Sequence, residues 1–331
     1  MPQLRKDPTT SRWVIVDNEH PMGAAEFPQE PRHKSSVDCP FCPGNEALTP
    51  PEIRVVGRKA DSRSASNWLI RVVPNKFPAV RIEESSELEG DGLYDRLGGF
   101  GAHEVIIENP DHEKEIPDLP TDHLSLLLQT FRDRILDLRK DPRFKYIIIF
   151  KNFGVAAGAS LEHPHSQLIA LPVVPSRVEQ EIRGAQTHQE RTERCLWCDM
   201  LKQEADGGGR LVIAQDGGFT AIAPFASRFP FETWVLPNRH EAAFDASSDA
   251  ELAALARLFK LTLGKLKKTL KNPPYNWMIH SLPLQASEAG SFHWHIEIIP
   301  HLTRVAGFEL GTGFYVNPTS PELAADTLRK A

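Results

Sequence analysis

The sequence predicts an α+β fold in which one unit of helix and strands occurs twice. Its 331 residues suit two domains at roughly 150 residues each. A cysteine pair, a strand ending in histidine and a His-x-His strand follow one another in this order two times, and a helix precedes each His-x-His strand. The paired histidines are 128 residues apart for His112 and His240, and 130 apart for His163 and His293. Such self-similarity indicates a repeated structural unit.

The first copy contains a predicted helix over residues 121–140. Its apolar residues recur at helical spacing on one face: Leu124, Leu127, Leu128, Phe131, Ile135 and Leu138. Thr121 or Asp122 is the predicted cap of this helix. Residues 146–150 are continuously apolar and predict a buried strand, and residues 152–160 form a loop rich in glycine and alanine that leads into the His-x-His strand.

The second copy repeats these elements. Ser248 begins a predicted helix, residues 276–280 form a strand, and a loop containing Gly290 leads into the second His-x-His strand. The two copies meet near residues 177–194, a charged segment predicted to be helical. The sequence therefore predicts an N-terminal catalytic domain over residues 1–180 and a second domain over residues 181–331.

The charge balance excludes several classes of partner. Lys and Arg number 38 against 44 Asp and Glu, a formal net charge of −6, which gives no basic surface for nucleic acid. No apolar run approaches the roughly 20 residues that cross a bilayer. The first residues lack the apolar stretch of a secretory signal. We therefore expect a cytoplasmic protein without a membrane or nucleic-acid partner.

The four cysteines form two Cys-x-x-Cys pairs, Cys39 with Cys42 and Cys195 with Cys198. Two intervening residues let both thiolates bind one tetrahedral ion, as in structural zinc sites, although thioredoxin-like redox pairs share the spacing. Pro40 and Pro43 give the first pair the character of a knuckle, which favours zinc. The second pair also favours zinc, but a helix through it would suit redox chemistry, and cysteines without a ligand remain an alternative.

The first His-x-His strand carries the predicted chemistry. Residues two apart on a strand share a face, so His163, His165 and Gln167 form a row of polar groups. Before them lie Gly158 and Ser160, in a loop whose small side chains let backbone N–H groups approach a phosphate. A neutral imidazole is a good nucleophile towards phosphorus. The pattern indicates phosphoryl or nucleotidyl transfer through a covalent phospho-histidine.

The segment GASLEHPHSQ resembles the active-site signature of the galactose-1-phosphate uridylyltransferase family of the histidine-triad superfamily, and CPFCPGNE and ENPDH resemble its zinc-site segments. The resemblance extends over essentially the whole chain. It implies two tandem histidine-triad-like domains with antiparallel half-barrel sheets and packed helices. It also implies a homodimer with the active site near the subunit interface.

The resemblance assigns roles to individual residues. His165 matches the nucleophile that attacks the α-phosphorus of a nucleoside diphosphate sugar, and Gln167 matches the side chain that hydrogen-bonds the phosphoryl oxygens. The positions that match nucleotide or phosphate contacts are Asn75, Asn152 and Ser160. The positions that match the ligands of a structural zinc ion are Cys39, Cys42, His112 and His163.

A second metal site can be assigned in two ways. Members with a second Cys-x-x-Cys bind zinc through positions that match Cys195, Cys198, His240 and His293. The best-known members bind iron or zinc through positions that match Glu181, His280, His293 and His295. The cysteine pair favours the first set, and we expect two zinc ions per chain. Glu297 stands where Gln167 would be repeated, so a second active site is not expected.

The leading hypothesis is a nucleotidyltransferase resembling UDP-glucose–hexose-1-phosphate uridylyltransferase. It would transfer UMP between sugar 1-phosphates in a ping-pong cycle of galactose metabolism. A near alternative is an ADP-sugar phosphorylase that uses the same histidine and has inorganic phosphate as acceptor. An alternative of another class is a non-catalytic, zinc-stapled nucleotide-binding module. Tyr315 stands where the best-known members place a sugar-contacting glutamine, so base, sugar and acceptor remain open.

Overall fold

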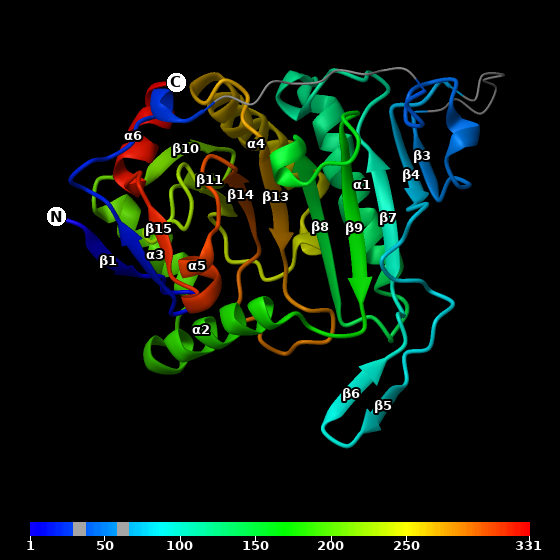
Figure 1. Ribbon diagram of the computed structural model, residues 1–331, viewed down its shortest axis with the longest axis horizontal. Coiled ribbons are helices and arrows are strands. Elements are labelled where there is room, and N and C mark those ends of the chain that lie inside the picture. Colours follow the sequence, from blue (N-terminus) through cyan, green and yellow to red (C-terminus); the bar gives the residue numbers. More distant parts are fainter. Residues whose placement is uncertain (29–37, 58–65) are drawn as a thin grey trace.

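The computed structural model describes residues 1–28, 38–57 and 66–331, and it confirms the α+β class. A ten-stranded sheet crosses the molecule, and all of its neighbouring strands are antiparallel (Figure 1). Its strands, in spatial order, are β10 (Val212–Asp216), β11 (Phe219–Ile222), β12 (Thr233–Pro237), β14 (His295–Pro300), β13 (Tyr275–His280), β8 (Tyr146–Phe153), β9 (His165–Leu171), β7 (Ala102–Ile107), β4 (Ile70–Pro74) and β3 (Arg54–Val56).

The repeat seen in the sequence is a repeat of strand order. From the middle of the sheet outwards, the first copy contributes β8, β9, β7, β4 and β3, and the second contributes β13, β14, β12, β11 and β10. The copies join where β8 pairs with β13, from Phe153 opposite Tyr275 to Ile149 opposite Ile279. Without this pairing both strands would expose a row of unpaired backbone groups. The two copies therefore form one continuous sheet.

Two long helices cover one face of this sheet, as Figure 1 shows. α1 (Thr121–Leu138) and α4 (Asp249–Thr269) are the two helices that the periodicity predicts, and they pack against each other. Trp277 of β13 is fully buried between Phe131 of α1 and Phe259 of α4. The core thus extends across both copies, and the predicted boundary after residue 180 falls inside α2 (Ser176–Thr192), the helix expected between them.

The starts of the two covering helices differ. Ser248, predicted to begin the second helix, is the residue directly before α4 and caps it: its side chain accepts the Glu251 N–H, and the Glu251 side chain accepts the Ser248 N–H. The predicted cap of α1 is wrong, because neither Thr121 nor Asp122 occupies that position. Pro120 does, and its carbonyl accepts the Leu124 N–H, so Thr121 is already the first helical residue.

Smaller elements surround the sheet (Figure 1). A three-stranded sheet contains β1 (Gln3–Lys6), β2 (Trp13–Val16) and β15 (Tyr315–Asn317), and β5 (Leu88–Asp91) with β6 (Tyr94–Leu97) forms a hairpin that projects from the body. The remaining helices are α3 (Leu196–Asp206), α5 (Gly307–Thr312), α6 (Pro321–Lys330) and the 3-10 turns η1 (Ala24–Glu26), η2 (Glu46–Leu48), η3 (Ile116–Asp118), η4 (Val155–Ala157) and η5 (Phe244–Ala246).

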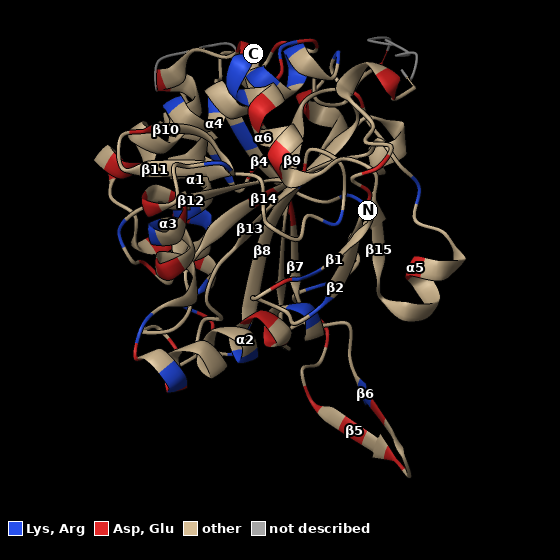
Figure 2. Ribbon diagram, turned by 90° about the vertical axis from the view of Figure 1, so that its left-hand side faces the viewer, with Lys and Arg blue, Asp and Glu red and all other residues tan. Residues whose placement is uncertain are grey.

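Charged side chains lie mainly on the helices and the hairpin, whereas the central strands carry few (Figure 2). In the described ranges, no helix combines the length and the apolar character needed to cross a membrane.

The shared core makes a prediction about cooperativity. Trp277→Ala should lower the free energy of unfolding by about 3–5 kcal/mol, because it empties the contact between α1 and α4. Unfolding should stay a single transition, measured by urea titration with both fluorescence and circular dichroism. Trp13→Ala, at a side chain that is 40% exposed, is the matched control and should cost about 1 kcal/mol or less. Two separate transitions in the Trp277 variant would contradict a common core.

Candidate active site and metal-binding groups

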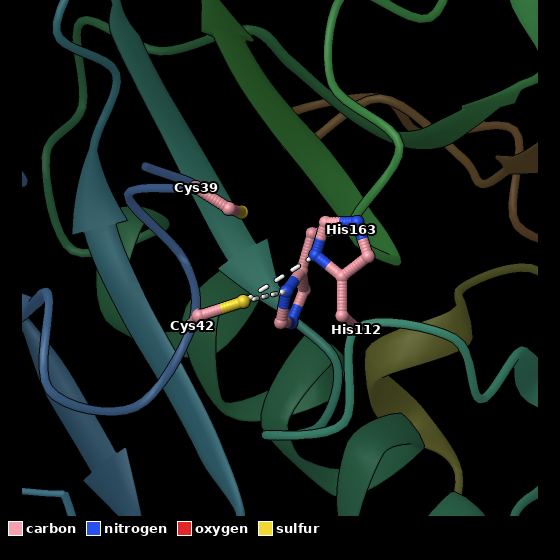
Figure 3. A group of neighbouring side chains, drawn as sticks. All are labelled: Cys39, Cys42, His112 and His163. Carbon is pink, nitrogen blue, oxygen red and sulfur yellow. Dashed lines mark hydrogen bonds between the residues drawn. The ribbon is translucent and has the colours of Figure 1, made fainter. Parts of the chain in front are cut away.

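Cys39, Cys42, His112 and His163 come together as the sequence predicts (Figure 3). The Cys42 Sγ lies 3.3 Å from the His112 Nδ1 and 3.6 Å from the His163 Nδ1. The two cysteines reach the group from the loop after residue 38, and His163 reaches it from just before β9. The ligand atoms of all four residues lie within 4.8 Å of one another, so the group could hold a metal ion.

The backbone orients the His163 ring for such a role. Its Nε2 lies 2.9 Å from the Asn109 carbonyl oxygen, which can only accept a hydrogen bond, so Nε2 carries the hydrogen and Nδ1 keeps its lone pair. Burial lowers the pKa of His163 to about 4, which keeps this lone pair free at neutral pH. Burial, together with the neighbouring Cys39 thiol, raises the pKa of Cys42 to about 11. A bound cation would favour ionisation of the Cys42 thiol.

Cys195, Cys198, His240 and His293 form the same arrangement in the second copy. The Cys198 Sγ lies 3.7 Å from the His240 Nδ1 and 3.6 Å from the His293 Nδ1. The Nε2 atoms of both histidines donate to backbone carbonyls, His240 to Ala289 and His293 to Pro237, each at 2.9 Å. All four cysteines are free thiols. α3 begins at Leu196, so Cys195 is its N-cap and Cys198 lies in its first turn.

The four residues of the alternative second metal site do not form one group in the structure. His293 lies with the cysteines, and the other three residues, Glu181, His280 and His295, form a separate buried group. The His280 Nδ1 lies 3.0 Å from the Glu181 carboxylate. Although burial acts in the opposite direction, this carboxylate raises the pKa of His280 to about 9. His280 is thus held as a cation between Glu181 and Glu297, whose carboxylate lies 3.4 Å from its Nε2.

His165 is the first residue of β9 and is buried. Its Nδ1 lies 2.8 Å from the His163 carbonyl oxygen, so Nδ1 carries the hydrogen and Nε2 keeps the lone pair. Burial lowers the pKa of His165, which favours the neutral imidazole. The Phe41 ring stands edge-on to it, with the ring centroids 5.3 Å apart. The geometry therefore presents Nε2 as a nucleophile.

A buried ion pair lies under this histidine. Glu108, directly after β7, pairs with Lys151 of β8, and neither side chain is more than 1% exposed. Glu108 also accepts the Ser166 hydroxyl, and its backbone N–H donates to the Pro164 carbonyl at 3.2 Å. Glu108 thus contacts the residues on both sides of His165. The sequence analysis missed this pair, because nothing in the spacing of Glu108 and Lys151 marks them as neighbours.

Gln167 lies on the face of β9 that is turned away from the core. The residues beside it in the strand, Ser166 and Leu168, are fully buried, whereas Gln167 is half-buried. Its Oε1 lies 2.9 Å from the Nε2 of His103. The Asn75 side chain contacts the same His103 ring, and its Nδ2 lies 3.1 Å from the His103 Nε2. His103, which the sequence analysis leaves as a structural histidine, therefore joins two of the predicted site residues.

The loop before β9 is tied to the second copy. Asn276 of β13 donates to the Asn152 side chain at 2.8 Å and to the Ala157 carbonyl at 2.9 Å. Gly158 has φ +85°, in the left-handed region that glycine enters freely. The sequence analysis did not find Asn276, because its partner lies 124 residues away. Asn152 therefore lies in β8 rather than in the predicted loop, and Asn276 ties it to the turn that ends at Gly158.

Two further residues singled out from the sequence have different surroundings. Ser160 is exposed on the loop between η4 and β9. Tyr315 begins β15 in the three-stranded sheet, where its ring packs on Phe229 and lies near the guanidinium groups of Arg12 and Arg228. Within the described residues of one chain, no contact joins either side chain to His165.

The second copy has a nucleophile position without a nucleophile's surroundings. The His295 Nδ1 lies 3.1 Å from the His293 carbonyl, as in the first copy. However, its ring is only 2% exposed and lies against Trp197, Trp234 and His280, with ring centroids 5.6, 5.3 and 4.8 Å away. Three rings therefore pack around the histidine that corresponds to His165 in the second copy.

Comparison with known proteins gives matches over the whole chain. Residues 1–175 match the model of a family described as galactose-1-phosphate uridyl transferase, N-terminal domain, and residues 118–331 match a domain of unknown function, DUF4921. The chain is 38% identical to ADP-glucose phosphorylase of Arabidopsis thaliana, covering 99% of this chain and 93% of the relative. It is 30% identical to galactose-1-phosphate uridylyltransferase of Thermotoga maritima, covering 100% and 98%.

The fold also matches solved structures. The crystal structure of the Arabidopsis thaliana ADP-glucose phosphorylase with bound ADP-glucose superposes with a TM-score of 0.85 at 35% identity, covering 100% of this chain and 99% of that one.

The buried ion pair under His165 makes a prediction about stability. Lys151→Met should cost about 3–5 kcal/mol of unfolding free energy, because it leaves the Glu108 carboxylate buried without a cation. Adding Glu108→Gln should restore most of the loss. Arg96→Met, which removes an exposed pair with Glu89, is the control and should cost less than about 1 kcal/mol. Urea denaturation measures all three, and a Lys151 variant no less stable than the control would refute the prediction.

Proposed function

The chain belongs to the galactose-1-phosphate uridyl transferase family, and from that premise we propose that it transfers a nucleotidyl group between phosphates through a covalent bond to His165. One observation carries the proposal: the His163 carbonyl accepts the Nδ1 hydrogen of His165 and leaves the Nε2 lone pair free. No separate base is needed, since the attacking atom carries no proton.

The reaction has two steps. In the first, the Nε2 lone pair attacks the α-phosphorus of a nucleoside diphosphate sugar, and the bond to the bridging oxygen breaks, so sugar 1-phosphate leaves. The imidazole then carries a positive charge, and its Nδ1–H still donates to the His163 carbonyl. In the second, a phosphate oxygen of the acceptor attacks the same phosphorus, and the bond to Nε2 breaks. Each step forms one bond to phosphorus and breaks one.

The other predicted site residues support these steps. The Gln167 amide lies two residues along the strand from His165, where it would donate to the phosphoryl oxygens as their charge grows. Asn152 at the end of β8 and Ser160 on the exposed loop before β9 would contact the nucleotide or its phosphates through their side chains. Asn75 would contact the nucleotide.

ADP-sugar phosphorolysis is the form of this reaction that the comparisons favour. The relative named ADP-glucose phosphorylase is more similar to this chain than the Thermotoga uridylyltransferase is, at 38% against 30% identity. The second cysteine pair with two histidines favours the same candidate, because members resembling that phosphorylase have such a group. Inorganic phosphate would then accept the adenylyl group, and the products would be ADP and sugar 1-phosphate.

Uridylyl transfer is the second candidate. The family description and the Thermotoga maritima relative favour it, because both name galactose-1-phosphate as the substrate. Here a hexose 1-phosphate would accept UMP from His165, and the protein would act in galactose metabolism. Both candidates need the same nucleophile, so they differ only in the base and in the acceptor.

Zinc is the metal that we assign to both Cys2His2 groups. Tetrahedral zinc with sulfur at about 2.3 Å and nitrogen at about 2.05 Å sets the sulfur–nitrogen separation at about 3.6 Å. The Cys42 separations of 3.3 and 3.6 Å and the Cys198 separations of 3.7 and 3.6 Å fit this value. Four protein ligands leave no open position, so the role would be structural.

We also propose that the protein is a homodimer in the cytoplasm. A homodimer is supported by large apolar side chains exposed on the projecting hairpin, where Leu88, Leu93 and Tyr94 are 67%, 97% and 77% exposed. A second copy of the chain would cover them. The free thiols suit a reducing compartment, so we place the reaction in the cytoplasm.

A two-substrate assay tests the function and separates the candidates. With ADP-glucose plus phosphate we expect release of glucose 1-phosphate, and with UDP-glucose plus galactose 1-phosphate little or no turnover. The donor labelled at the α-phosphorus should leave acid-labile, alkali-stable label on His165, because the phosphorus bonds to nitrogen. His165→Ala should abolish the label, and His188→Ala, at a histidine paired with Asp199, should retain it.

Three outcomes would change the proposal. Turnover of the uridylyl pair alone would make the second candidate correct. Tight nucleotide binding without label from either donor would indicate a non-catalytic binding module. Label that survives His165→Ala would place the nucleophile elsewhere.

Metal analysis tests the zinc assignment. We expect two zinc ions per chain. Cys39→Ser should lose one of them and lower the melting temperature, because metal binding and folding are coupled. His20→Ala, at an exposed histidine, should keep both ions and melt like the wild type. Cys39→Ser with full zinc content and unchanged melting would refute a structural site, and thiols that react readily in the zinc-loaded protein would favour redox chemistry.

A further inference from the structure

His103 occupies a position that the proposed mechanism does not yet use. It lies on β7, which pairs with β9 so that Val105 stands opposite Gln167. Two residues earlier in the strand, His103 projects from the same face as Val105, and its half-buried ring reaches the Gln167 side chain. The ring therefore lies beside the residue expected to stabilise the transferring phosphoryl group.

A backbone contact decides which ring nitrogen carries the hydrogen. The Ala79 N–H donates to the His103 Nδ1 at 3.1 Å, and a nitrogen that accepts this hydrogen bond has none of its own. The neutral ring then carries its hydrogen on Nε2. Since Nε2 lies 2.9 Å from the Gln167 Oε1, it donates to that oxygen.

This donation sets the direction of the Gln167 amide. An amide has an accepting oxygen and a donating nitrogen on opposite sides, and rotation by 180° exchanges them. With its oxygen held by His103, Gln167 turns its NH2 group away from the ring. Asn75 cannot accept the same hydrogen, because the atom that it places 3.1 Å from Nε2 is its amide nitrogen, a donor, while its oxygen accepts the Phe77 N–H at 2.9 Å.

The second copy shows what replaces this pair where no active site is expected. Trp234 stands opposite Glu297, as Val105 stands opposite Gln167, so Glu232 takes the position of His103. Both carboxylates pair with the buried Arg228. The second copy thus has a carboxylate, Glu297, at this position and no amide donor. The first copy has the Gln167 amide, whose direction His103 sets.

We propose that His103 is a positioning residue that holds the Gln167 amide with its NH2 group directed at the phosphoryl oxygens. The inference rests on the proposed function. Without His103 the amide rotates freely and presents its oxygen to the phosphoryl group for part of the time, which repels the growing negative charge. The loss falls on the chemical step and leaves nucleotide binding unchanged, because the donation matters most in the transition state.

A double-mutant cycle on the full-length protein tests this role. The measured rate is formation of label on His165 in a single turnover with the α-labelled donor. Gln167→Ala should slow it about 100- to 1,000-fold, and His103→Phe should slow it about tenfold or more, with the Kd for the donor unchanged. In the Gln167→Ala background, His103→Phe should cause no further loss, because the amide it orients is gone.

Two matched variants complete the cycle. His103→Gln places an amide N–H near the position of Nε2 and should keep the rate within about threefold of the wild type. His188→Phe removes a histidine of similar exposure away from the sheet face and should leave the rate unchanged. Additive losses in the double variant, or a His103→Phe effect confined to Kd, would overturn the role. If the wild type never acquires label, the proposed function fails, and this inference fails with it.

A measurement on the wild-type protein tests the tautomer of His103 directly and uses a variant only to assign the signals. Nitrogen-15 NMR of histidine-labelled protein should show His103 as a neutral ring with hydrogen on Nε2, assigned by the loss of its signals in His103→Gln. A ring with hydrogen on Nδ1, or on both nitrogens, could not hold the Gln167 oxygen and accept the Ala79 N–H together. Either form would overturn the inference.

Discussion

The hydrogen bond from the His165 Nδ1 to the His163 carbonyl is the constraint on which the site depends. It joins a residue of the first Cys2His2 group to the proposed nucleophile, two positions further along the chain. The His163 ring is itself fixed by the Asn109 carbonyl. A metal held by that ring would therefore fix the carbonyl that selects the tautomer of His165. In this way a structural metal would influence catalysis without any contact to substrate.

Comparison of the two copies distinguishes the features of the scaffold from those of the proposed chemistry. Both copies have a Cys2His2 group, a His-x-His strand and the same hydrogen bond between its two histidines. What differs is the surroundings of the second histidine: Phe41 and a glycine-rich loop in the first copy, and Trp197, Trp234 and the His280 cation in the second. The Cys2His2 groups therefore belong to the architecture of the repeated unit, and the proposed catalytic role depends on the surroundings of His165 in the first copy.

Local patterns in the sequence predicted the two long helices and the two Cys2His2 groups, because each of these depends on the spacing of residues along the chain. Helical periodicity identified α1 and α4, and the paired cysteines and histidines identified both metal-binding groups. Contacts that depend on register between strands could not be predicted this way. His103 and Gln167 are 64 residues apart, and Asn276 and Asn152 are 124 apart; their meeting follows from which strands pair. The predicted cap of α1 was wrong for a local reason: Pro120 occupies the capping position, and no side chain caps the helix there.

Period-two alternation in β8 and β9 divides the sheet into two faces with different tasks. Leu168 and Ile149 turn towards α1 and α4 and join the core. Gln167 and Asn152 turn the other way, to the face that bears the proposed chemistry. Ser166 and Lys151 are polar residues on the core side, and they are tolerated there because Glu108 satisfies both. A hydrophobic replacement of the pair would pack as well, but it would remove the carboxylate that accepts the Ser166 hydroxyl next to His165. The buried charges are therefore best understood as the support of the nucleophile from the core side.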